Sequence, residues 1–228
     1  MRKRAAIAVV AFMGFLGLIP LLANSIPRLL PSVPPTPTPN MPIREDFEDS
    51  VLQGIGILAG QANWEIVDDG TGNHVFQIDN SNQQEWPGFT IGPSISDGVI
   101  EYRVRLLDFD LSQDNGSGIV NLFFRNGPSG GYVFALHPYY KRTQVCSVDT
   151  NGVWSLPLDG GMSTMFLQRD VWHTLQVELE GQSIYVNLDG TLLSTVMDDR
   201  FHTGQVVLGI GPDTYAQFDD ISVVYEIP

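Results

Sequence analysis

WHTLQVELEGQSIYVNL, at residues Trp172–Leu188, is the stretch that decides the fold class. Hydrophobic and polar side chains alternate on both sides of a turn at Gly181 and Gln182. A period of two places one set of side chains on a core and the other in solvent, which is the pattern of a half-buried β-strand. The segment therefore predicts an antiparallel hairpin that extends to Leu193. Its hydrophobic members are Leu175, Val177, Leu179, Ile184, Val186 and Leu188.

The same pattern recurs along the chain after Arg44. No stretch of a dozen residues there has sustained helical periodicity, and short alternating runs are separated by turn dipeptides. Asn-Gly and Asp-Gly pairs supply the positive φ angles that tight hairpin turns require. Many short strands at this spacing predict an all-β sandwich or barrel. The dipeptides are Asp69-Gly70, Asp97-Gly98, Asn115-Gly116, Asn126-Gly127, Asn151-Gly152, Asp159-Gly160 and Asp189-Gly190.

Segments in a fixed order also carry a family resemblance. They are DGVIEYRVR (Asp97–Arg105), GIVNLFFR (Gly118–Arg125), GYVFAL (Gly131–Leu136), WHTLQV (Trp172–Val177), IYVNLDG (Ile184–Gly190) and FDDISV (Phe218–Val223). Together they resemble the concanavalin A-like lectin/glucanase superfamily over about residues 43–226. The laminin-G-like modules, the family 16 glycoside-hydrolase-like domains and the 3-keto-disaccharide hydrolase domains are the most similar members. The resemblance implies that residues 43–228 form a jelly-roll β-sandwich of two antiparallel sheets, one of them concave and ligand-binding.

An uncharged apolar run at residues 5–23 follows the basic residues Arg2, Lys3 and Arg4. As a hydrophobic helix it would be roughly 28 Å long, close to the hydrocarbon thickness of a bilayer. The basic flank predicts that the remainder of the chain crosses the membrane. Residues 1–25 are therefore expected to be either a signal peptide, cut near Ala23-Asn24-Ser25, or an uncleaved signal anchor, which the length favours. Both alternatives predict an extracellular or cell-surface domain.

Residues 26–42 form a Pro/Thr-rich linker. Proline at nearly alternate positions from Pro31 to Pro39 prevents a helix or a β ladder and favours extended polyproline II. The linker is expected to hold the domain away from the membrane.

Charge excludes one class of partner. All 26 acidic residues lie after Asn40, whereas four of the 12 basic ones precede it, which leaves eight basic residues and a formal net charge of −18 for residues 41–228. Such a field repels phosphate backbones, so nucleic-acid binding is not expected.

The single cysteine, Cys146, cannot close an intramolecular disulfide, and its β-strand context predicts a buried small hydrophobic residue.

The candidate ligand site lies on the side of three central strands that is opposite the core. Sugars are bound by aromatic faces and by planar polar side chains that hydrogen-bond hydroxyl groups in pairs. An alternative is that the arginines pair with Glu101 or with loop aspartates and the tyrosines cover a sheet edge. The residues are Arg103, Arg105, Asn121, Phe123, Arg125 and His137 on the strands, with Tyr139, Tyr140 and Trp154 beyond them.

A catalytic reading has less support. Family 16 glycosidases carry a Glu-x-Asp-x-x-Glu motif, because retaining hydrolysis needs two carboxylates about 5–5.5 Å apart. The corresponding strand here, Gly131–Pro138, contains no carboxylate. Glu178 and Glu180 share a strand face next to a turn. They are expected to face solvent rather than to act as a catalytic pair.

A structural calcium ion is the cofactor that the resemblance implies. Acidic residues begin and nearly end the domain, and the first and last strands of a jelly roll are commonly neighbours. Calcium takes 6–8 oxygen ligands. Glu48 and Asp220 are the predicted ligands, and zinc is not indicated because the four histidines are scattered.

These observations favour an exported, membrane-tethered module that binds a glycan or cell-wall polysaccharide without catalysis. Two other classes stay open. One is a divergent glycoside hydrolase acting on a disaccharide or a β-glucan, and the other is a protein-binding or structural surface module.

Overall fold

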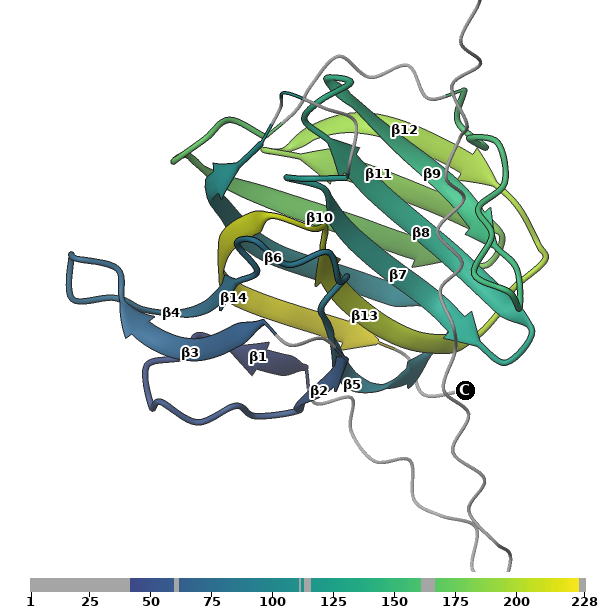
Figure 1. Ribbon diagram of the computed structural model, residues 1–228. Helices are drawn as coiled ribbons and strands as arrows, with labels where there is room; N and C mark the ends of the chain where they lie inside the picture. The colour runs from purple at the N-terminus through teal and green to yellow at the C-terminus, as the bar shows by residue number, and fades with distance from the viewer. Residues whose placement is uncertain (1–41, 60–61, 111, 113–115, 161–166, 226–228) are drawn as a thin grey trace, which may run out of the picture.

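The computed structural model describes residues 42–59, 62–110, 112, 116–160 and 167–225. In this part of the chain the strands pair antiparallel to form two stacked sheets (Figure 1). The predicted all-β sandwich of two antiparallel sheets is therefore confirmed. The expected N-terminal helix at residues 5–23 and residues 26–41 of the linker lie outside the described residues. The described residues contain no helix long and apolar enough to cross a membrane.

The larger sheet has eight strands. Its order is β12 (Thr191–Met197), β11 (Ser183–Leu188), β10 (Trp172–Glu180), β6 (Gly98–Phe109), β14 (Thr214–Tyr225), β4 (His74–Asp79) and β3 (Asn63–Asp68), and β1 (Ile43–Glu45) also pairs with β14. The predicted hairpin is confirmed as β10 and β11, with Val177 opposite Val186. The hydrophobic members of that hairpin are buried in the core.

The second sheet has six strands. Its order is β2 (Ile55–Ala59), β5 (Gly88–Ile95), β13 (Gly204–Ile210), β7 (Val120–Gly127), β8 (Gly130–His137) and β9 (Arg142–Val148). The chain leaves the eight-stranded sheet after β6, forms β7, β8 and β9 in the six-stranded sheet, and returns with β10 (Figure 1). Sequence neighbours therefore do not always share a sheet.

Aromatic side chains join the two sheets at one end of the core. Phe89 of β5 packs edge-on against Phe76 of β4 and Phe218 of β14, with ring centroids 5.3 Å and 5.6 Å apart. All three rings are buried. Edge-to-face pairs at this spacing stabilise a core beyond the area that they bury. The space between the two sheets is thus filled by the hydrophobic core.

Candidate ligand-binding faces

The structure separates the predicted site residues into two groups. Arg103 and Arg105 lie on β6 of the eight-stranded sheet, whereas Asn121, Phe123 and His137 lie on β7 and β8 of the six-stranded sheet. The prediction that these three strands share one outer face is wrong. In a jelly roll the chain passes from one sheet to the other, so strands that follow each other in sequence can lie on opposite sides of the core.

Arg125 does not point outward as predicted. A bulge between Phe124 and Gly127 breaks the pairing of β7 with β8, and Arg125 adopts a φ of +46°. Its side chain is only 1% exposed. The guanidinium donates from Nε to the Ser96 carbonyl (2.8 Å) and from Nη2 to Asp97 Oδ1 (2.8 Å). Arg125 therefore ties β7 to the turn between β5 and β6.

The outer face of β7, β8 and β9 has a floor of small side chains. The strand register places Ala135 between Asn121 and Gln144. The next row holds Val133 and Cys146, and these two pack with Ala135 in a separate hydrophobic cluster. Cys146 is buried as predicted, and burial raises the pKa of its thiol to about 11. The thiolate required for nucleophilic chemistry is therefore disfavoured.

Trp154 lies over this floor. Its ring centroid is 6.3 Å from both the Phe123 and the His137 rings, which belong to different strands. The segment around it is held along β9 by backbone hydrogen bonds, such as the one from Ser155 N to Ser147 O (2.8 Å). Trp154 is thus fixed across the sheet and remains partly exposed.

Planar polar side chains flank the floor. Gln144, which the sequence reasoning did not select, lies with its Nε2 3.0 Å from Nε2 of His137. Its outward position follows from the alternation of β9, in which Val145 faces the core. Asn121 is 2% exposed, and its Oδ1 accepts no hydrogen bond within the described residues. An unsatisfied buried acceptor of this kind is uncommon in folded proteins.

Exposed aromatic rings continue the face at the β8–β9 turn. Tyr139 and Tyr140 are 42% and 44% exposed, and their ring centroids are 5.0 Å apart. The ring centroid of Tyr140 also lies 6.2 Å from that of His137. The guanidinium of Arg142 is 4.6 Å from the Tyr140 ring centroid. The six-stranded sheet therefore brings together Asn121, Phe123, His137, Tyr139, Tyr140 and Trp154 of the predicted set and adds Gln144 and Arg142.

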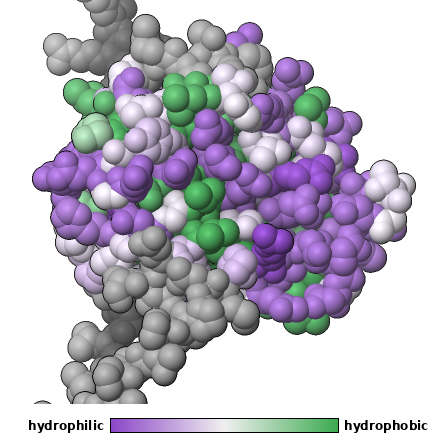
Figure 2. All heavy atoms as spheres, turned by 180° about the vertical axis from the view of Figure 1, so that it is seen from behind, coloured by the Kyte–Doolittle hydropathy of each residue, from purple (hydrophilic) through white to green (hydrophobic). Residues whose placement is uncertain are grey.

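The outer face of the eight-stranded sheet is a network of polar side chains. Figure 2, in which this sheet lies nearer the viewer, shows a surface of mostly hydrophilic residues with a few hydrophobic ones between them. Arg105 Nε donates to Gln217 Oε1 (3.1 Å), Gln217 Nε2 donates to Gln77 Oε1 (2.9 Å), and Gln77 Nε2 donates to Glu65 Oε1 (2.8 Å). Successive bonds thus cross from β6 to β3.

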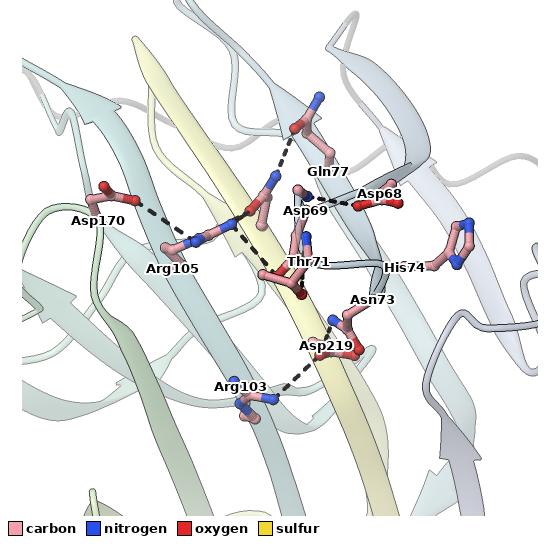
Figure 3. Close-up of polar contacts among 12 residues, drawn as sticks. Asp68, Asp69, Thr71, Asn73, His74, Gln77, Arg103, Arg105, Asp170 and Asp219 are labelled. Carbon is pink, nitrogen blue, oxygen red and sulfur yellow. Dashed lines mark hydrogen bonds and ion pairs between the residues drawn. The ribbon is translucent and has the colours of Figure 1, made fainter.

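Aspartates pair with both arginines of this face. Arg103 Nη1 lies 2.9 Å from Asp220 Oδ2 and 3.4 Å from Asp219 Oδ2, and Figure 3 shows its contact with Asp219. Arg105 lies within 4.0 Å of Asp69 and Asp170. The pairs of Arg105 match the alternative in which the arginines pair with loop aspartates, whereas the partners of Arg103 lie on strand β14. Both guanidiniums also lie over Trp172, which the sequence reasoning missed, at 4.8 Å and 4.9 Å from its ring centroid.

The predicted calcium ligands have protein partners. Glu48 accepts a hydrogen bond from the backbone N–H of His74 (3.0 Å), and Asp220 pairs with Arg103. Within the described residues no group of three or more His, Cys, Asp or Glu side chains could hold a metal ion. Calcium at Glu48 and Asp220 therefore stays a prediction. A thermal melt with and without chelator tests it, and an unchanged midpoint would contradict it.

Comparison with known proteins supports the architecture. No protein-family model matches the chain, and no curated protein matches it. Among solved structures, the carbohydrate-binding module CBM66 from Bacillus subtilis is similar at 19% identity and a TM-score of 0.58, covering 75% of this chain and 95% of that chain. The β-glucanase of Bacillus licheniformis is similar at 13% identity and a TM-score of 0.58, covering 83% of this chain and 100% of that chain.

A third similar structure is domain 4 of AbnA, an extracellular arabinanase from Geobacillus stearothermophilus, in complex with arabinotriose. It is 11% identical with a TM-score of 0.55, and the match covers 80% of this chain and 90% of that chain. These similar structures support the two-sheet β fold that the sequence resemblance predicted. Identities this low define the fold, and function has to be argued from the site.

Proposed function

We propose that this protein is an exported, membrane-tethered carbohydrate-binding module that recognises a glycan or cell-wall polysaccharide without catalysis. The observation that carries the proposal is the outer face of β7, β8 and β9, where exposed rings adjoin planar polar side chains. Tyr140 and Trp154 offer aromatic faces for the C–H groups of a sugar. Asn121 and Gln144 of the same face are buried at 2% and 6% exposure, so the aromatic rings provide the contact surface.

The similar solved structures add support of a general kind. Two of them are described as a carbohydrate-binding module and as an arabinanase domain with bound arabinotriose. The apolar run at residues 5–23 and the Pro/Thr linker support a location outside the cytoplasm, held at a membrane surface. The mass of the mature N-terminus distinguishes a cleaved signal peptide from a retained anchor.

The two alternatives have less support. None of the strands of the six-stranded sheet contains Asp or Glu, so their outer face offers no carboxylate pair for glycoside hydrolysis. Turnover of a disaccharide or a β-glucan would overturn the non-catalytic part of the proposal. A protein-binding module would bind none of the glycans and would be cross-linked to a protein at the cell surface.

A glycan array probed with the full-length protein tests the proposal. We expect binding to at least one polysaccharide, and Tyr140→Ala should weaken it about tenfold because a stacking face is lost. Tyr185→Ala is the matched control, since Tyr185 lies on β11 and faces outward from the other sheet. Equal losses in the two variants, or no binding to any glycan, would contradict the proposal.

A further inference from the structure

Carboxylates are distributed unequally between the two sheets. The strands of the six-stranded sheet contain no Asp or Glu. The strands of the eight-stranded sheet contain Glu45, Glu65, Asp68, Asp79, Glu101, Asp108, Glu178, Glu180, Asp219 and Asp220. Residues 41–228 carry a formal net charge of −18, and the strands of the six-stranded sheet themselves add no negative side chain that would repel an anionic ligand.

Arg142 differs from most arginines of the domain. A carboxylate lies within 4.0 Å of Arg103, Arg105, Arg125, Arg169 and Arg200. No carboxylate of the described residues lies within 4.0 Å of Arg142, and the Arg142 side chain donates no hydrogen bond to a described residue. Its Nε is buried without a hydrogen-bond partner. Arg142 is therefore not paired with a described carboxylate, although acidic residues are abundant in the domain.

The position of Arg142 joins it to the proposed glycan face. It is the first residue of β9, pairs with His137 of β8, and lies two residues before Gln144 on the same outer side. Its guanidinium lies 4.6 Å from the exposed Tyr140 ring. A sugar stacked on Tyr140 would thus have a positively charged fork beside it. Asp159, in the segment that follows Trp154, accepts a hydrogen bond from the backbone N–H of Val145 (3.1 Å).

We propose that the glycan bound on this face is acidic, with Arg142 binding the carboxylate of a uronic acid residue. The proposal rests on the proposed carbohydrate-binding function. Guanidinium and carboxylate match in a bidentate geometry, and the charge-assisted bonds are stronger than those between neutral groups. Stacking on Tyr140 orients the guanidinium but satisfies none of its N–H donors. A neutral sugar would leave the charge without a partner, whereas a uronate supplies one.

Uronate oligosaccharides and their methyl esters test the charge requirement with the full-length protein. Oligogalacturonate and oligomannuronate are titrated calorimetrically, each beside its methyl ester, which keeps the ring and hydroxyl groups and removes the negative charge. We expect one acid to bind at least about tenfold more tightly than its ester. Arg142→Gln should abolish that preference, and Arg142→Lys should retain part of it because a point charge lacks the bidentate fork.

Arg44→Gln is the matched control, because Arg44 is exposed on β1 and also has no carboxylate within 4.0 Å among the described residues. It should leave the acid preference unchanged. Thermal melts of the variants show whether they fold. Equal binding of acid and ester, or a preference that survives in Arg142→Gln, overturns the inference. Binding to neutral glycans alone overturns the inference while the carbohydrate-binding function stands, and binding to no glycan contradicts both.

Discussion

The outer faces of the two sheets differ in how their polar groups are satisfied. On the eight-stranded sheet, amides, arginines and aspartates bond to one another from strand to strand (Figure 3). On the six-stranded sheet, Asn121 Oδ1 and Arg142 Nε have no hydrogen-bond partner in the described part of the chain. The polar groups of the first face thus satisfy one another, whereas the second face holds two buried polar atoms whose bonding is incomplete among the described residues. Polar density alone therefore does not locate a binding site.

Replacing buried Arg125 should have the largest effect on stability. Arg125→Met leaves the carbonyls of Ser96 and Phe201 without their donor and removes the pair with Asp97, so we expect a loss of about 3 kcal/mol. Arg105→Met on the other face should cost about 1 kcal/mol, because that guanidinium is more exposed. Urea unfolding measures both. Equal costs would mean that the two arginines do not differ in structural role.

Acid stability should depend on Asp198, beside the six-stranded sheet. Burial alone raises its pKa, but hydrogen bonds from Arg200 and Tyr132 outweigh burial and lower the pKa to about 2. A folded-state pKa below the unfolded value of about 3.9 stabilises the fold above that pH, and this contribution disappears as the pH falls towards 2. Asp198→Asn should therefore flatten the pH dependence of the urea midpoint between about pH 4 and pH 2. An unchanged slope would show that the contact contributes nothing.

Two buried tyrosines should respond in opposite directions. Tyr132 of β8 donates its hydroxyl to Asp198 Oδ1 (2.6 Å), so Tyr132→Phe should lower stability by about 1 kcal/mol. The hydroxyl of Tyr102 on β6 is buried without a hydrogen-bond partner among the described residues, so Tyr102→Phe should raise stability by about 1 kcal/mol. Chemical denaturation measures both changes. A loss in Tyr102→Phe would indicate that its hydroxyl is bonded in solution.

The candidate site was predictable only in part. The alternation of β7, β8 and β9 correctly indicated that Asn121, Phe123 and His137 point away from the core. The alternation gave the wrong direction for Arg125, because a bulge and a positive φ turn this side chain inward. It also placed Arg103 beside Asn121, although β6 and β7 belong to different sheets.

The sequence by itself determined the all-β class, the β10–β11 hairpin and the burial of Cys146, because these follow from the two-residue period of a strand and from local turn chemistry. Tertiary structure alone decided which strands share a face. Strand pairing is a contact between distant segments, and no local pattern encodes which sheet a strand joins. The meeting of Gln144, Arg142 and Tyr140 with Asn121, and the bonded network on the opposite face, are consequences of that pairing.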